Sequence, residues 1–150
     1  MAIASPQVEP LLPPTGNDAV DWTITTPGTY VGYWADGLGG TELLQAQFRF
    51  LYGTGSGGIR VCLQSSLDQG TTAFDVVVED FAAVAKTAIF AIRQGSSSTV
   101  LAPGEGGNDA AGFSVSPGVQ CSVLGDRFRL KVIVTGTYAN TVLSSRILAS

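Results

Sequence analysis

The 150-residue sequence contains no histidine, so it lacks the commonest general base near neutral pH and the commonest protein metal ligand. This absence excludes serine–histidine–aspartate catalysis, and no group of residues has the spacing of a metal site. The sequence therefore predicts neither an enzyme nor a cofactor-binding or metal-binding protein. Catalysis by aspartate or glutamate stays open, because sequence does not show which carboxylates converge in space.

Charged residues are scarce, at 13% of the chain against 45% hydrophobic residues, and the net charge is −4. A nucleic-acid-binding surface needs a broad basic patch, so we expect no nucleic-acid partner. The longest hydrophobic candidate, residues 81–92, is interrupted by Lys86 and is too short to span a membrane. The N-terminus lacks the basic start of a secretion signal, and Pro10, Pro13 and Pro14 interrupt any apolar core. We therefore expect no membrane partner and no secretion.

Only two cysteines are present, Cys62 and Cys121, and they do not form a Cys-X-X-Cys motif. In its expected strand Cys62 shares a face with Arg60, whereas Cys121 shares a face with Val119 and Val123. These environments differ, so a bond between the two sulfurs is not expected. We predict two free thiols in a protein made in a reducing compartment.

Signals for turns and short strands are abundant, with nineteen glycines, seven prolines and no sustained helical period. Residues 44–51 alternate clearly between apolar and polar side chains, as a half-buried strand does. About eight such segments follow one another along residues 19–150. We predict an all-β domain there, an antiparallel β-sandwich or jelly-roll of about eight strands.

The segment 125–138 contains three of the eight basic residues on one side of an expected strand. Its two faces consist of Phe128, Leu130, Val132 and Val134 on one side and Arg127, Arg129, Lys131 and Ile133 on the other. Successive strand side chains point to opposite faces. We therefore expect an apolar face in the core and a cationic face that meets water or a charged partner.

Residues 1–18 contain four of the seven prolines and are predicted to be an extended N-terminal arm. Two interpretations are open. The arm is a disordered tail, or it becomes ordered against a neighbouring subunit. In the second case its apolar anchors are Ile3, Val8, Leu11 and Leu12.

Residues 65–72 predict a well-defined turn. Four of them, Ser66, Asp68, Gly70 and Thr72, match the Ser-X-Asp-X-Gly-X-Thr portion of the Asp-box motif. In such a turn the carboxylate accepts backbone N–H groups and the glycine supplies a positive φ. A single copy indicates a structural turn rather than a glycosidase.

Three aromatic residues, Tyr30, Tyr33 and Trp34, precede the glycine-rich segment 36–40. Such residues commonly pack in a core or at its rim. The alternative is a ligand platform, because exposed aromatic rings beside flexible glycines suit carbohydrate stacking.

Three stretches, 61–72, 124–132 and 135–141, resemble small virion proteins of tailed bacteriophages that are encoded among head and tail-connector genes. They read Val-Cys-Leu-Gln-Ser-Ser-Leu-Asp-Gln-Gly-Thr-Thr, Leu-Gly-Asp-Arg-Phe-Arg-Leu-Lys-Val and Thr-Gly-Thr-Tyr-Ala-Asn-Thr. The resemblance covers roughly residues 44–150, and the usual aromatic residue after Thr72 is absent. It implies a β-sandwich that serves as a capsid decoration (cement) protein or another structural component, with no catalytic residues.

The resemblance also implies partners and a location. We expect the protein to bind the major capsid protein and other copies of itself, on the capsid surface, after assembly in the bacterial cytoplasm. The expected contacts are the arm and the face of Arg127, Arg129 and Lys131. The alternative is a tail-fibre or receptor-binding domain that recognises glycans through Tyr30, Tyr33 and Trp34.

Overall fold

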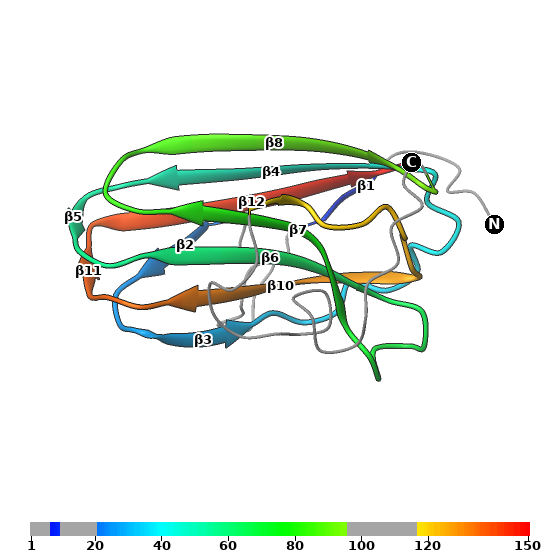
Figure 1. The fold of residues 1–150 in the computed structure, drawn as a ribbon, viewed down its shortest axis with the longest axis horizontal. Coiled ribbons are helices and arrows are strands. Elements are labelled where there is room, and N and C mark those ends of the chain that lie inside the picture. Colours follow the sequence, from blue (N-terminus) through cyan, green and yellow to red (C-terminus); the bar gives the residue numbers. More distant parts are fainter. Residues whose placement is uncertain (1–6, 10–20, 96–116) are drawn as a thin grey trace.

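The computed structural model describes residues 7–9, 21–95 and 117–150, and these residues form two antiparallel β-sheets packed together (Figure 1). Sheet A consists of β1 (Gln7–Glu9), β2 (Asp21–Ile24), β4 (Leu43–Leu51), β8 (Lys86–Arg93) and β12 (Thr141–Ala149). Sheet B consists of β3 (Gly28–Val31), β6 (Ile59–Ser66), β7 (Phe74–Phe81), β9 (Gly118–Val119) and β10 (Arg127–Val134). A small third sheet pairs β5 (Thr54–Gly55) with β11 (Tyr138–Ala139).

The predicted all-β sandwich is confirmed. Eight of the twelve strands have four residues or more, and the described residues include no helix. Accordingly, no described segment is a helix of the length and apolarity that crossing a membrane requires.

The order of strands in sheet A is β1-β12-β4-β8, and β2 also pairs with β12. β1 and β2 use the same side of β12, because Gln7 pairs with Ala149 and Asp21 pairs with Ser144. In sheet B the order is β3-β10-β6-β7-β9. Strand β10 therefore lies between β3 and β6, and its Lys131 is paired with Cys62 of β6.

The alternation predicted for residues 44–51 is present in β4. The inward side chains are buried and belong to Leu44, Ala46, Phe48 and Phe50. Gln45 and Arg49 point to the opposite face and are exposed. This strand gives sheet A one face in the core and one face open to solvent.

Aromatic rings connect the two sheets. Phe50 of β4 stacks on Phe81 of β7, with the ring centroids 5.1 Å apart. Tyr138 of β11 meets Phe50 edge-on at 6.4 Å. Burial of a phenylalanine side chain contributes about 1.5–3 kcal/mol, so this cluster is a substantial part of the core.

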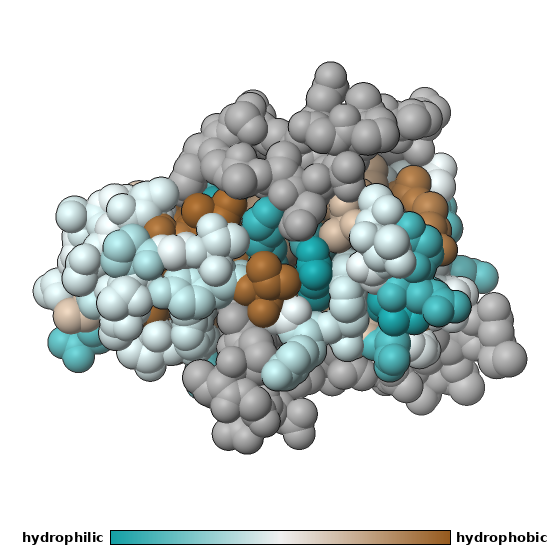
Figure 2. All heavy atoms as spheres, turned by 90° about the horizontal axis from the view of Figure 1, so that it is seen from below, coloured by the Kyte–Doolittle hydropathy of each residue, from teal (hydrophilic) through white to brown (hydrophobic). Residues whose placement is uncertain are grey.

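The surface seen from below Figure 1 shows hydrophobic residues in separate groups among hydrophilic ones (Figure 2). The largest exposed fractions among apolar side chains belong to Tyr33, Leu67 and Ile89. Of these, Ile89 lies on a strand, β8, and is considered below.

Candidate functional site

The cationic side of β10 is occupied by contacts within the chain. Arg127 forms an ion pair with Asp126, Nε to Oδ1, at 3.2 Å. Arg129 donates from Nε to Gln64 Oε1 at 2.8 Å, and its guanidinium lies 4.5 Å from the ring centre of Trp34. Lys131 is only 5% exposed. The expectation that this side of the strand meets water is therefore wrong at Lys131.

The physical reason is that the outward side of sheet B is itself buried around its middle strand, β6. The outward-pointing side chains of β6, which belong to Arg60, Cys62 and Gln64, are all buried. Alternation along a strand shows which residues share a face, but it does not show whether that face is covered. The buried polar side chains here have partners, as buried polar groups generally do.

These partners form a polar network across β10, β6 and β7. Gln64 accepts from Arg129 and donates from Nε2 to Asp75 Oδ1 at 2.9 Å. Arg60 donates from Nε and Nη2 to the two carboxylate oxygens of Asp80, at 2.7 and 2.8 Å. These hydrogen bonds to Asp80 hold the pKa of Arg60 above its ordinary value. A satisfied network of this kind fixes the register of three strands.

Both cysteines are free, as predicted, and the structure shows that both are buried. Burial, followed by the nearby Asp75 carboxylate, raises the pKa of the Cys62 thiol to about 12. Burial also raises the pKa of Cys121. Because the thiolate is the reactive form, neither sulfur has the environment of a nucleophile.

The turn after β6 forms the hydrogen bonds expected of the Asp-box residues. Asp68 Oδ1 accepts the Thr72 N–H at 2.7 Å and the Ser66 hydroxyl at 2.8 Å. Gly70 has a φ of +93° and donates its N–H to Ser66 Oγ at 2.8 Å. A Cβ at position 70 would lie 2.7 Å from Trp34 Nε1, so the tryptophan packs directly against this turn.

The three aromatic residues considered as a ligand platform lie in different environments. Tyr30 packs against the core, meets Trp22 edge-on at 4.8 Å and donates its hydroxyl to the Thr26 carbonyl at 2.9 Å. Trp34 is held between Arg129 and the turn at Gly70. Tyr33 is 74% exposed. Tyr30 and Trp34 are thus packing residues, and of the three only Tyr33 has a ring exposed enough to stack on a ligand.

Of the predicted anchors in the arm, Val8 lies in β1, where it pairs with Leu148 of the same chain. Ile3, Leu11 and Leu12 lie outside the described residues. The described part of the predicted arm is therefore an edge strand of sheet A.

Three exposed arginines lie on the other sheet, on the outer face of sheet A. Arg49 of β4, Arg93 of β8 and Arg146 of β12 are exposed and have no hydrogen bond or ion pair within the described chain. All eight basic residues are in the described part, and the other five are in ion pairs, in the polar network or buried. We call the outer surface around these three residues the arginine face.

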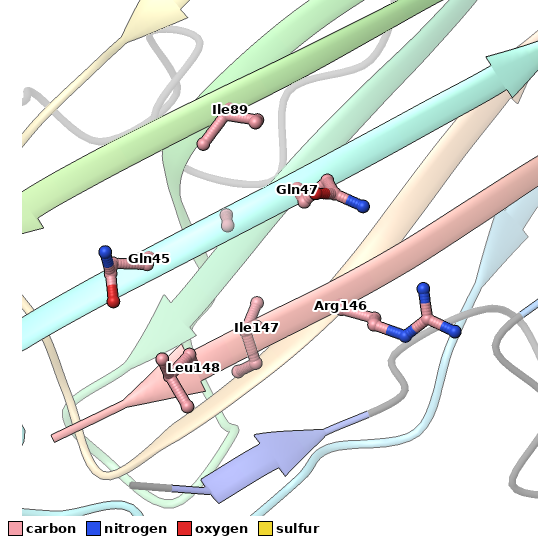
Figure 3. Close-up of a pocket in the computed structure, with 7 residues that line it drawn as sticks. Gln45, Gln47, Ile89, Arg146, Ile147 and Leu148 are labelled. Carbon is pink, nitrogen blue, oxygen red and sulfur yellow. The ribbon is translucent and has the colours of Figure 1, made fainter.

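Strand register places the three arginines on the same side of sheet A, in different rows, and Arg146 borders a depression in this surface. Ile89, Gln47 and Arg146 form one row across β8, β4 and β12. The next row consists of Ala91, Gln45 and Leu148. Between these rows lies a shallow depression of about 260 Å³. Figure 3 shows its labelled side chains arranged along the three strands, with Ile89 on β8 and Arg146 on β12.

The chemistry of the arginine face suits an acidic protein surface. Guanidinium groups bind carboxylates through two parallel hydrogen bonds, and they lose less hydration energy than ammonium groups do. Ile89, which is 69% exposed, adds an apolar contact between them. Asp21 lies at the border of this face and receives a hydrogen bond from the Ser144 hydroxyl.

Sequence reasoning missed the arginine face, although the position of Arg49 beside Gln45 and Gln47 was visible in the alternation of residues 44–51. Arg93 and Arg146 come from distant segments, and only the pairing of β8 and β12 with β4 places them on the same side. No group of three or more cysteine, aspartate or glutamate side chains in the described residues is arranged to hold a metal ion. Comparison of the chain with protein families, curated proteins and solved structures gave no match.

Proposed function

We propose that this protein is a structural component of a bacteriophage virion, which decorates the head shell and stabilises it by binding rather than by catalysis. The resemblance of residues 61–72, 124–132 and 135–141 to small phage virion proteins supports this function. A β-sandwich with a satisfied polar network suits it as well, because a decoration protein must hold a fixed shape between its neighbours.

One observation carries the proposal. The three cations without an internal partner lie on the same open face of sheet A, one on each of β4, β8 and β12, although the whole molecule has a net charge of −4. Arginine is enriched at protein interfaces, whereas lysine is depleted there. The arginine face, with the exposed Ile89 on its β8 side, is therefore the proposed contact with an acidic surface of the shell protein.

The proposal places the contact on sheet A rather than on β10. Arg127 and Arg129 are engaged by Asp126 and Gln64, and Lys131 is buried. Docking through these three residues would break existing contacts before new ones form. Docking through the arginine face requires no such loss.

The test is binding of purified protein to phage shells that lack it, measured by co-sedimentation at two salt concentrations. Arg146→Gln and Arg49→Gln should each weaken binding about two- to fivefold, because an exposed ion pair contributes at most about 1 kcal/mol. The double variant should bind more weakly still and show a smaller salt dependence. Arg127→Gln is the matched control, because it removes the same charge from the other sheet, and it should bind like the wild type.

Two results would overturn the proposal. One is wild-type protein that does not bind shells at all. The other is loss of binding in Arg127→Gln with normal binding in both sheet A variants, which would return the contact to β10. The alternative of a glycan-binding domain predicts binding on a glycan array that is lost in Tyr33→Ala, together with few copies per particle. Hundreds of copies per virion would favour the decoration protein.

A further inference from the structure

β8 forms one border of sheet A. Within the described residues it pairs with β4 and with no other strand (Figure 1). An edge strand presents a row of unpaired backbone N–H and C=O groups, and these can pair with another chain. β8 is eight residues long and contains no proline, so every residue of the strand has a backbone N–H. Just beyond its C-terminal end, Gly95 N–H donates to the Ser122 carbonyl at 2.9 Å, so the free part of the edge is the strand itself.

The register shows which backbone groups of β8 point outward. Gln94 N–H donates to Glu42 O at 2.8 Å, so residue 94 bonds toward β4. In antiparallel pairs hydrogen-bonded positions alternate, and Lys86, Ala88, Phe90 and Ile92 therefore bond toward β4 as well. The two hydrogen bonds between Leu43 and Ser150 agree with this alternation. They show that the odd-numbered residues of β4 bond toward β12, which leaves its even-numbered residues to bond toward β8. The backbone groups of Thr87, Ile89 and Ala91 are thus directed to the open edge.

The central part of this edge lacks the features that protect edge strands. Native edges usually carry charged side chains or proline, which discourage pairing with another chain. Residues 87–91 are uncharged, and Ile89 in their middle is 69% exposed. The charged residues of β8 are at its two ends: Lys86, which pairs with Glu79 at 2.8 Å, and Arg93.

We propose that β8 pairs with β8 of a second copy of this chain, in antiparallel orientation about a two-fold axis at Ile89. In this register Ile89 is opposite Ile89 of the second copy, and Thr87 is opposite Ala91 of the second copy. The outward N–H and C=O groups of these three residues become hydrogen-bonded, and the two Ile89 side chains lie beside each other on the outer face of the joined sheet. Lys86 and Arg93 lie outside the paired segment, so no like charges are directly opposite each other.

A second copy fits this edge better than it fits the arginine face. Two arginine faces placed against each other would bring like charges together, whereas pairing through β8 joins the two A sheets side by side. Both arginine faces then point in the same direction, and the dimer presents two docking surfaces to one shell. This pairing specifies how two copies associate, and it rests on the proposed function, in which the protein binds other copies of itself. It is tested on purified protein without shells, so either idea can fail while the other stands.

Disulfide trapping tests the register. Opposite residues in a hydrogen-bonded antiparallel pair have Cα atoms about 5.5 Å apart, within the range that a disulfide spans. Ile89→Cys should therefore give a covalent dimer on mild oxidation. Gln47→Cys is the matched control, because Gln47 lies beside Ile89 in sheet A but one strand inward. Its distance from the same residue of the second copy is about 14 Å, three strand spacings, so this variant should remain monomeric on a non-reducing gel.

Sedimentation of the protein without engineered cysteines tests the association itself. Wild type should show a concentration-dependent monomer–dimer equilibrium. Ile89→Lys should be monomeric, because it places two like charges opposite each other. Its circular dichroism should match the wild type, since the Ile89 side chain is largely in solvent. A wild-type protein that stays monomeric, or equal cross-linking of the two cysteine variants, would overturn the inference.

Discussion

Asp68 shows how one side chain holds a turn through its charge. Its carboxylate accepts the Thr72 N–H and the Ser66 hydroxyl, and these hydrogen bonds hold the pKa of Asp68 below its ordinary value. Hydrogen bonds to the charged form favour that form. The ionised carboxylate is therefore the state that stabilises the connection between β6 and β7.

We predict a pH dependence that follows from this shift. A carboxylate whose pKa is lower in the folded chain than in the unfolded chain stabilises the fold at pH values above its unfolded-state pKa, which is about 4. This stabilisation is lost as the pH falls through the folded-state pKa. At neutral pH the melting temperature should decrease in the order wild type, Asp68→Asn, Asp68→Ala. As the pH falls through the lowered folded-state pKa of Asp68, the wild type should approach Asp68→Asn. Calorimetric melting curves of the three proteins at several pH values would measure this.

The comparison with Asp68→Asn is needed because Asp126 behaves in the same way. Its ion pair with Arg127 lowers the pKa of Asp126, so the wild type loses stability in acid at two places. Asp126 and its partner Arg127 are present in all three proteins, so the main cause of the Asp126 shift is common to them, and the Asp68 charge is only the smallest of its causes. A constant difference between the wild type and Asp68→Asn across the whole pH range would contradict the prediction.

The residues of this turn could be predicted from sequence, whereas the state of Lys131 could not. The Ser-X-Asp-X-Gly-X-Thr pattern acts locally, since each of its hydrogen bonds joins residues at most four positions apart. The burial of Lys131 depends on what lies over the outer side of sheet B, which is a property of the whole fold. Strand alternation correctly places Phe128 and Leu130 in the core. It does not show whether the side chains on the opposite face are exposed to solvent or covered.

At the scale of elements, the entry into β10 depends on close contact between two backbones. The Gly125 N–H donates to Ser65 Oγ at 2.8 Å, and the next N–H, that of Asp126, donates to the Ser66 carbonyl at 3.1 Å. A Cβ on residue 125 would collide with the Ser66 carbonyl oxygen. Glycine is therefore required where β10 begins its pairing with β6.

Gly125→Ala should destabilise the protein by about 3 kcal/mol, because the obstacle is backbone at the end of a fully buried strand and cannot move aside without disturbing the ladder. Gly39→Ala is the matched control. Its Cβ would meet the Asp126 Cβ at 3.6 Å, which is an ordinary contact, so the change should be within about 0.5 kcal/mol. Urea unfolding followed by tryptophan fluorescence measures both. Equal stability of the two variants would show that the strand entry relaxes freely.

Strand pairing also explains why the individual strands were easier to predict than the arginine face. Residues 44–51 have a period of two that any single strand reveals, and β4 follows it closely. The arginine face depends on the register of β8 and β12 against β4, and the three arginines are distributed over almost a hundred residues of sequence. No local pattern connects them.

At the scale of the whole molecule, the two borders of sheet A differ. One border is β8, with its open edge. At the other border, β1 pairs with the C-terminal end of β12. Gln7, Val8 and Glu9 lie opposite Ala149, Leu148 and Ile147. The predicted arm therefore has a role within its own domain at these three residues, and its role toward neighbours stays a prediction.

Two truncations separate these roles. Removing residues 1–6 leaves β1 in place, whereas removing residues 1–18 deletes it and exposes the edge of β12 at residues 147–149. The longer truncation should lower the free energy of unfolding by about 2 kcal/mol relative to the shorter one, because three residues of ladder are lost, and it should aggregate more readily through the new edge. Chemical unfolding and light scattering measure both effects. Each truncation should then be tested for shell binding at a temperature where both are folded. Weaker binding by the 1–18 truncation alone would assign a contact to residues 7–18, whereas normal binding by both would leave docking to the arginine face.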